Sequence, residues 1–272
     1  MRNLVLVLAL ILGALVLMYF WVGVPTVYQE KIPEAGTPHL AYDQERLIKN
    51  IHISAFYFVP KNKINLKLAG WKEVLENNLK KLQAFHELQF RGRSHIEYSI
   101  YSEPVVGMED NLKYDTESTE HGNQRALLSV AEELDRRSLV KREGDAYPVM
   151  FIMYEGVGAS GGVIYESNLE STEEISKKLG LSASVIFKVN INSVDGFFIV
   201  ARKFLADPEY VIIGVSTLAH EFYHTLGLED KYEVSEAAAF ESVSSQDLMG
   251  SGRKASLNKT YLGIEALKLF GL

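Results

Sequence analysis

The chain contains no cysteine, and this absence removes several kinds of chemistry. Disulfide bonds, thiolate metal ligands and a cysteine nucleophile are all excluded, whereas both reducing and oxidising compartments stay possible. Lysine and arginine form no basic run, and the net charge is -7. The electrostatic footprint of a nucleic-acid-binding protein is therefore missing, and nucleic acid is not an expected partner. The sequence also lacks internal repeats and low-complexity tracts.

The composition favours one folded domain. The chain has 272 residues, of which 47% are apolar and 23% are charged, ordinary values for a globular protein. This length accommodates a membrane segment followed by a domain of about 200 residues, which is within the usual limit for a single hydrophobic core.

The first segment is strongly apolar. Residues 4–24, LVLVLALILGALVLMYFWVGV, carry no charge and are long enough to span the hydrocarbon core of a bilayer. The aromatic residues 19–21 stand where a signal peptide would have small residues, which favours an uncleaved anchor. Arg2 and the α-amino group favour a cytoplasmic N-terminus. We therefore expect residues 1–24 to be a single-pass anchor in the cell membrane, with the rest of the chain outside the cytoplasm.

Residues 25–48 contain three prolines among scattered polar residues and predict a linker. The remaining residues, 49–272, alternate between strand-like and helix-like segments, and this alternation predicts an α/β domain with a mixed, twisted sheet flanked by helices. The predicted strands are 50–59, 94–101, 148–154, 161–167 and 184–191, and the predicted amphipathic helices before residue 208 are 71–88 and 123–142.

A further helix is predicted at residues 208–227, where a proline opens an apolar run and Gly227 stands at its end. His220 and His224 are one helical turn apart, so two imidazoles can bind one metal ion. Glu221 stands beside that ion without having to bind it. Its carboxylate can accept a proton from a metal-activated water, so this spacing predicts metal-assisted peptide hydrolysis.

A third ligand is expected because catalytic zinc usually has three protein ligands and one open position. Gly227 can adopt the left-handed conformation that ends a helix and turns the chain sharply. Asp230 follows this turn, and its short side chain suits a position that is already close to the ion. Glu229 and Glu233 are competing candidates for the third ligand. Glu236 and Glu241, farther along the chain, would be the ligand only if it came from another helix.

The stretch HEFYHTLGLED resembles the zinc-binding signature of the metzincin clan of metallopeptidases. The pattern HExxHxxGxxD has odds of about one in ten thousand of arising by chance at this length and composition. The resemblance implies a metzincin-like zincin domain with one catalytic Zn²⁺, three ligands and a general base. The ligands would be His220, His224 and Asp230, and the base would be Glu221. Most of the clan has histidine as the third ligand, so Asp230 resembles minority branches that include immune-inhibitor-A-like proteases.

Residues 245–252, SQDLMGSG, resemble the methionine turn that lies beneath the zinc in this clan, with Met249 as the methionine. The clan often has a tyrosine just past that methionine, and here it is missing. Tyr223 and Tyr232 are alternative hydrogen-bond donors, although each suits a structural role better. The clan also has an edge strand that binds an extended substrate, for which residues 161–167 are the candidate.

We therefore expect a membrane-anchored zinc endopeptidase whose partners are a protein or peptide substrate and, through residues 4–24, the lipid bilayer. The alternative is a catalytically inactive zinc-binding surface module that recruits a protein partner. Glu221 argues against this alternative, because a purely structural zinc site has no use for a general base. The acidic runs 109–122 and 166–174 could hold structural Ca²⁺. Their composition is the only feature of the sequence that suggests this.

Two other hydrolase classes fit less well. Residues 158–162 match GxSxG with Ser160 as nucleophile, but a strand-like segment follows, where the nucleophile elbow requires a helix. An intramembrane metalloprotease would carry its histidines on a spanning helix. The apolar run of residues 210–219 is about half as long as such a helix requires.

Overall fold

The structure is a computed structural model that describes residues 48–115, 122–140, 142, 144–156, 161–164, 193–228, 230–231 and 246–270. All of these residues belong to one of the chain's two compact units, the unit of residues 41–272. The predicted anchor at 1–24, the predicted linker except for Ile48, and the predicted strand at 184–191 lie outside the described residues. Within the described ranges, no helix combines the length and the apolar composition needed to cross a bilayer.

The described strands form one sheet in the order β2, β1, β4, β6, β5, and the short β3 also pairs with β1. β5 runs antiparallel to β6, and every other pairing is parallel, so the sheet is mixed, as the sequence predicts. The strands are β1 (Asn50–Val59), β2 (His95–Ile100), β3 (Val105–Val106), β4 (Tyr147–Tyr154), β5 (Gly161–Ile164) and β6 (Gly196–Ala201).

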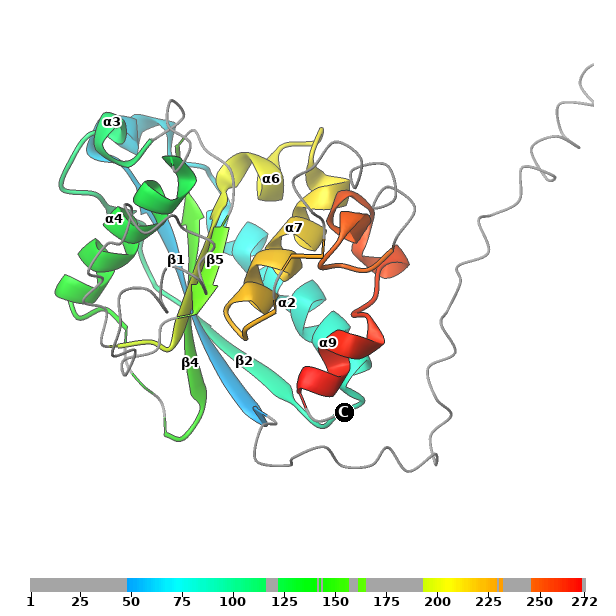
Figure 1. Ribbon diagram of the computed structural model, residues 1–272. Coiled ribbons are helices and arrows are strands. Elements are labelled where there is room, and N and C mark those ends of the chain that lie inside the picture. The colour runs from blue at the N-terminus through cyan, green and yellow to red at the C-terminus, as the bar shows by residue number, and fades with distance from the viewer. Residues whose placement is uncertain are drawn as a thin grey trace, which may run out of the picture. The chain divides into compact units, whose positions relative to one another are not determined.

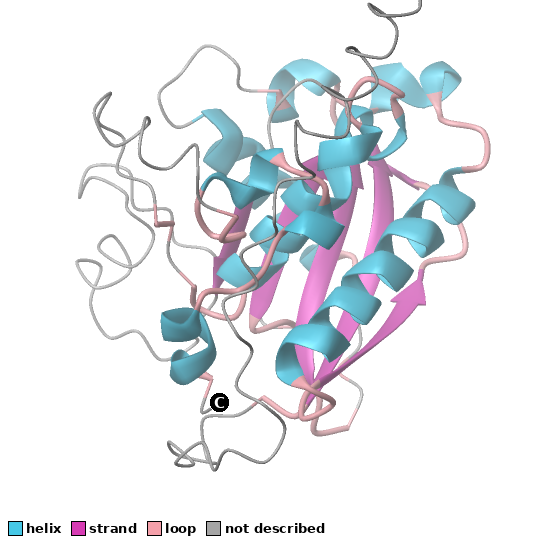
Figure 2. Ribbon diagram, turned by 90° about the vertical axis from the view of Figure 1, so that its right-hand side faces the viewer, coloured by secondary structure: helices cyan, strands magenta, loops and turns pink. Residues whose placement is uncertain are grey.

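Helices cover both faces of the sheet (Figure 1). One face carries α3 and α4, and the opposite face carries α2, α7 and α9; of these, α2 and α7 lie in front of the strands in Figure 2. The α-helices of the described residues are α2 (Trp71–Phe90), α3 (Asn111–Tyr114), α4 (Gly122–Arg136), α6 (Arg202–Ala206), α7 (Val211–His224) and α9 (Ile264–Leu269), with 3₁₀ turns at η1 (Lys61–Leu66), η3 (Ser251–Lys254) and η4 (Leu257–Lys259).

The central strands are buried on both faces because successive side chains point to opposite sides of a strand. In β4, Phe151 and Met153 pack into the core shared with α2 and α7, whereas Met150 and Ile152 pack into the core shared with α4. The continuous apolar run of β4 predicted such a central strand, and this is confirmed. The neighbouring strand β6, GFFIVA, is also a continuous apolar run and is also buried on both faces, but it is not among the strands predicted above.

Candidate metal centre

The predicted helix at 208–227 is α7, which begins at Val211 and ends at His224. Most of this helix is buried, because it packs against both β5 and β6 and against α2. The carbonyl oxygen of Thr225, just past its last turn, accepts a hydrogen bond from the hydroxyl of Tyr147 at 2.8 Å. The end of the helix that carries the two histidines is therefore held against the sheet.

The rings of His220 and His224 lie side by side one helical turn apart, with centroids 4.6 Å apart. Their Nε2 atoms face each other at 3.1 Å. His220 is almost fully buried, and His224 is partly buried. The i, i+4 spacing thus brings two imidazole nitrogens to one point.

Both imidazoles are oriented by backbone carbonyls. His220 Nδ1 lies 2.9 Å from the carbonyl oxygen of Leu248, and His224 Nδ1 lies 2.7 Å from that of Leu228. A carbonyl oxygen can only accept, so each Nδ1 carries a hydrogen and donates it. In the neutral ring, Nε2 then presents a lone pair. Histidine ligands of metals are usually oriented in this way by a partner at the other ring nitrogen.

The turn after α7 brings Asp230 to the same point. Gly227 has φ +94°, the left-handed conformation that the sequence predicted for it. After this turn, Asp230 Oδ1 lies 3.1 Å from His220 Nε2 and 3.4 Å from His224 Nε2. Three atoms that can each offer a lone pair therefore lie within 3.4 Å of one another.

These distances fit zinc. Bonds of about 2.0–2.1 Å in a tetrahedral site place neighbouring ligand atoms about 3.3 Å apart. The observed separations of 3.1, 3.1 and 3.4 Å bracket this value. Two imidazole nitrogens and one carboxylate oxygen are also a donor set that zinc uses in catalytic sites, with a fourth position left for water or substrate.

The charges around the site hold Asp230 ionised. Burial raises the pKa of Asp230, but hydrogen bonds that His220 and His224 donate when Nε2 carries a proton outweigh it and hold the pKa well below the usual range. Burial lowers the pKa of His224, but its hydrogen bond to Asp230 and the negative charges of Glu221 and Asp230 raise it above the ordinary value overall. Without a metal, a proton on Nε2 therefore satisfies the carboxylate, and a cation bound at this point would take the place of that proton.

Glu221 is a second carboxylate beside the histidines. It is buried, and its oxygen and one nitrogen from each of His220 and His224 lie within 4.8 Å of one another. Asp230 Oδ1 lies 3.1 and 3.4 Å from the two Nε2 atoms, which is the spacing of neighbouring zinc ligands, and this favours Asp230 as the third ligand. Glu221 stays adjacent to the site, where a general base would have to stand.

The predicted methionine turn lies beside α7. Met249 is fully buried in the core cluster that includes Leu218 and Phe222 of the helix. The preceding residue, Leu248, supplies the carbonyl that orients His220.

The acidic runs considered for Ca²⁺ are only partly described. In the run at 109–122, Asp115 accepts hydrogen bonds from Asn111 and Tyr154, and the run at 166–174 lies outside the described residues.

Tyr223 does not face the metal centre. Its side chain is fully buried, and its hydroxyl lies 3.2 Å from Nδ1 of His86, a buried residue of α2. His86 Nε2 in turn lies 2.9 Å from Ser94 Oγ, which donates to the carbonyl oxygen of Ile48. Tyr223 therefore has the structural role that suited it better. The other candidates, Glu229, Tyr232, Glu233, Glu236, Glu241 and Ser160, lie outside the described residues.

The strand-like residues 161–167 form β5 over Gly161–Ile164. β5 is the last of the described strands in the sheet order, and α7 packs against it (Figure 1).

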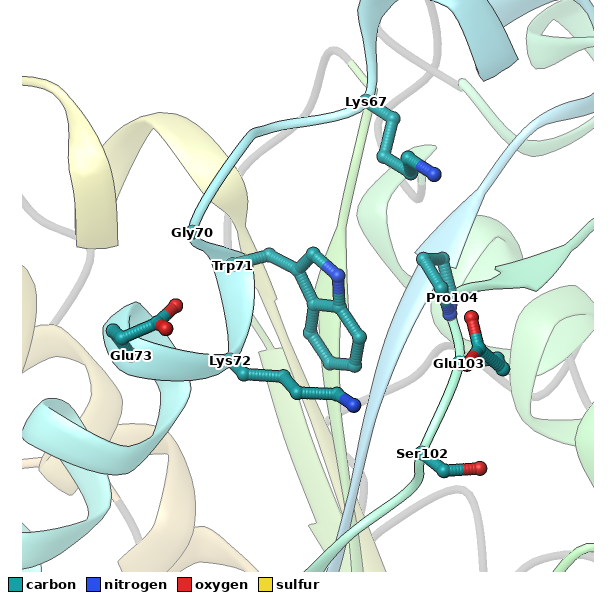
Figure 3. A pocket seen from close by; sticks show the side chains of 8 residues that line it. All are labelled: Lys67, Gly70, Trp71, Lys72, Glu73, Ser102, Glu103 and Pro104. Atoms are coloured by element: carbon teal, nitrogen blue, oxygen red, sulfur yellow. The ribbon is translucent and has the colours of Figure 1, made fainter.

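A separate open hollow lies between the start of α2 and residues 102–104 (Figure 3). Lysines and glutamates line it around Trp71, and none of the metal-centre residues contributes to it.

No protein-family model matches the chain, and no curated protein matches it. Two crystal structures of OgpA from Akkermansia muciniphila are similar in structure, one of a catalytically inactive form in complex with an O-glycopeptide substrate and one of the wild type. Each has a TM-score of 0.42 and 13% sequence identity. Each comparison covers 82% of this chain, which spans 60% of the OgpA chain. At this level of similarity, the case for a function stands on the residues of the site.

Proposed function

We propose that the protein is a zinc-dependent endopeptidase with a metzincin-like catalytic domain. The observation that carries this proposal is the approach of His220 Nε2, His224 Nε2 and Asp230 Oδ1 to within 3.4 Å of one another. The orientation of both rings by backbone carbonyls supports it, because this arrangement aims the lone pairs at one point.

His220, His224 and Asp230 would hold the metal. Zinc in this position would supply Lewis acidity for the scissile carbonyl and a water of lowered pKa. Glu221 would accept a proton at its carboxylate and return it to the leaving amine. Its burial beside the histidines supports this role, because a carboxylate there has a short path to both the water and the scissile bond.

The substrate would be an extended peptide. Among the described strands β5 is the last in the sheet and lies next to α7, so a peptide could add main-chain hydrogen bonds to it while its scissile bond lies near the histidines. Residues 4–24 would anchor the chain in the cell membrane, with the catalytic domain outside the cytoplasm. Carbonate extraction of membranes tests the anchor: the full chain should remain in the pellet, whereas a chain without residues 1–24 should not.

The experiment that tests the catalytic role uses two variants of the full chain in mild detergent. Glu221→Ala should keep its zinc and lose roughly 10²- to 10⁴-fold in the rate of peptide-library cleavage, the usual contribution of a general base. Asp230→Ala should lose zinc as well as activity. Cleavage by Glu221→Ala at the wild-type rate would refute the mechanism. A zinc-loaded wild-type protein that cleaves no peptide would favour the inactive, partner-recruiting module.

A further inference from the structure

The turn at residues 247–249 contacts both parts of the metal centre. The carbonyl of Leu248 accepts the hydrogen bond from His220 Nδ1 at 2.9 Å. The carbonyl of Met249 accepts a hydrogen bond from the backbone N–H of Lys231 at 2.9 Å. The carboxylate of Asp247 accepts a hydrogen bond from Lys231 Nζ at 2.5 Å. Three consecutive residues therefore hold the ligand helix on one side and the residue after Asp230 on the other.

The ion pair of Lys231 with Asp247 occupies a tightly defined space. Asp247 Oδ1 also accepts the backbone N–H of Met249 at 3.1 Å, so the carboxylate is fixed within the turn. A Cβ at Gly263 would lie 2.4 Å from Asp247 Oδ2 and 2.6 Å from Lys231 Nζ, so the glycine leaves room for the ion pair as it stands. The Asp247 side chain is 10% exposed, and that of Lys231 is 37% exposed. Such a pair is screened less than two charges on the open surface.

The position of Asp230 depends on how its backbone is held. An aspartate side chain is short, so its carboxylate reaches the histidines only if residue 230 itself stays close to them. From Gly227 the chain leaves α7 by a left-handed turn, and Lys231 is bonded to the 247–249 turn through both its backbone and its side chain. On the basis of the function proposed above, we propose that Lys231 and Asp247 are positioning residues whose ion pair keeps Asp230 within ligand distance of His220 and His224.

The sign of one substitution separates positioning from a simple charge effect. Lys231 follows Asp230 directly in the chain and carries a positive charge, and such a charge alone opposes the binding of a cation. If charge were its only effect, Lys231→Met would bind zinc more tightly than the wild type. A positioning role has the opposite consequence, because the backbone at Asp230 is then held by the main-chain bond alone and zinc binds more weakly.

The test measures metal affinity and local order in the full chain purified in mild detergent. Zinc affinity is measured by competition with a chromophoric chelator, and the coordination of Co²⁺ is followed by its visible absorption. Hydrogen exchange of residues 226–231 is measured in the zinc-free protein. Lys231→Met should weaken zinc binding about 10- to 100-fold, as losses of outer-shell partners do. It should also alter the Co²⁺ spectrum and speed exchange at residues 226–231.

Controls and a second variant keep the outcome decisive. Lys80→Met removes an exposed ion pair with Glu76 on α2 and should leave all three measurements unchanged. Asp247→Asn should weaken zinc binding as Lys231→Met does. The double variant should bind zinc no more weakly than the single variant with the lower affinity. Lys231 is partly exposed and keeps its backbone bond after substitution, so its variant is the one expected to fold normally.

Zinc binding by Lys231→Met that is as tight as in the wild type, with an unchanged Co²⁺ spectrum, overturns the proposal. A wild-type chain that binds no metal overturns the proposed function instead. In that case the exchange data decide on the ion pair itself. Faster exchange in Lys231→Met supports its positioning role, and unchanged exchange refutes it.

Discussion

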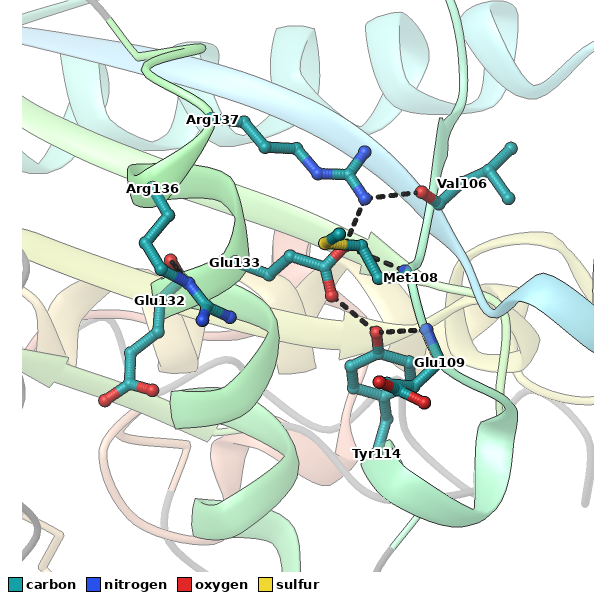
Figure 4. Close-up of polar contacts among 8 residues, drawn as sticks. All are labelled: Val106, Met108, Glu109, Tyr114, Glu132, Glu133, Arg136 and Arg137. Carbon is teal, nitrogen blue, oxygen red and sulfur yellow. Dashed lines mark hydrogen bonds and ion pairs between the residues drawn. The ribbon is translucent and has the colours of Figure 1, made fainter.

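Two clusters of polar side chains, on opposite faces of the sheet, satisfy their hydrogen-bonding groups differently. On the α4 side, Glu133 is buried and accepts hydrogen bonds from the hydroxyl of Tyr114 at 2.5 Å, from the backbone N–H of Met108 at 2.9 Å and from Arg137 (Figure 4). Each of these partners is a donor that meets an acceptor. Burial and the hydrogen bond to Glu133 raise the pKa of Tyr114 to about 12, so it remains a donor at neutral pH.

On the α7 side, the donors point away from the centre of the cluster. The Nδ1–H groups of His220 and His224 are directed at backbone carbonyls, and the two Nε2 atoms point at each other and at Asp230. The Glu133 cluster completes itself with protein hydrogen bonds, and this is what a structural network does. In the α7 cluster, atoms that can offer lone pairs lie around one point, and a bound cation would satisfy them together.

The largest expected effect of this difference is on zinc binding. Asp230→Ala should lower zinc affinity by more than about 100-fold, because loss of an outer-shell partner already costs 10- to 100-fold. Competition with a chromophoric chelator measures this affinity. Glu133→Ala is the matched carboxylate control and should bind zinc as the wild type does. Equal zinc affinity in the Asp230→Ala variant and the wild type would remove Asp230 from the ligand set.

The second effect is on stability and reverses the roles of the two carboxylates. Glu133→Ala should lower the free energy of unfolding by about 3 kcal/mol, because it leaves Arg137, Tyr114 and a backbone N–H without their acceptor. Chemical denaturation of the zinc-free protein measures the loss. Glu132→Ala is the control, since its carboxylate points away from the cluster in Figure 4. A loss no larger than that of Glu132→Ala would contradict the structural role of Glu133.

The third effect concerns pH and a histidine that is satisfied by protein donors and acceptors. Burial, with a smaller contribution from the charge of His95, lowers the pKa of His86 to about 3. The unfolded chain protonates this histidine near pH 6.5, and the folded chain does not. His86 therefore contributes its full stability above about pH 6.5, and this is lost as the pH falls towards 3, at up to about 1.4 kcal/mol per pH unit.

Replacing His86 should flatten that dependence. The free energy of unfolding of His86→Gln, measured between pH 4 and 8, should fall less steeply with acid than that of the wild type. The variant should be less stable at pH 8, because the hydrogen bonds to Tyr223 and Ser94 are altered. Identical slopes in the two proteins would show that His86 is not protonated on unfolding.

The features that depend on short-range spacing were the ones that the sequence could predict. The strands β1 and β4 and the helix α7 follow from runs and periodicity within about 20 residues, and the left-handed turn at Gly227 follows from one residue type. The carbonyl of Leu248 could not be predicted, because it reaches His220 from 28 positions away. The same is true of His86, whose neighbour Tyr223 lies 137 positions away and around which no motif exists. By contrast, β6 could have been predicted, because its continuous apolar run is like that of β4.

The central claim is that His220, His224 and Asp230 hold one zinc ion. Its most direct test is the metal content of the full chain, determined by elemental mass spectrometry after purification without chelator or metal-affinity resin. The wild type should carry about one zinc per chain, and the His220→Ala, His224→Ala double variant should carry none. A folded wild-type chain that binds no metal, even after zinc is offered, would contradict the claim.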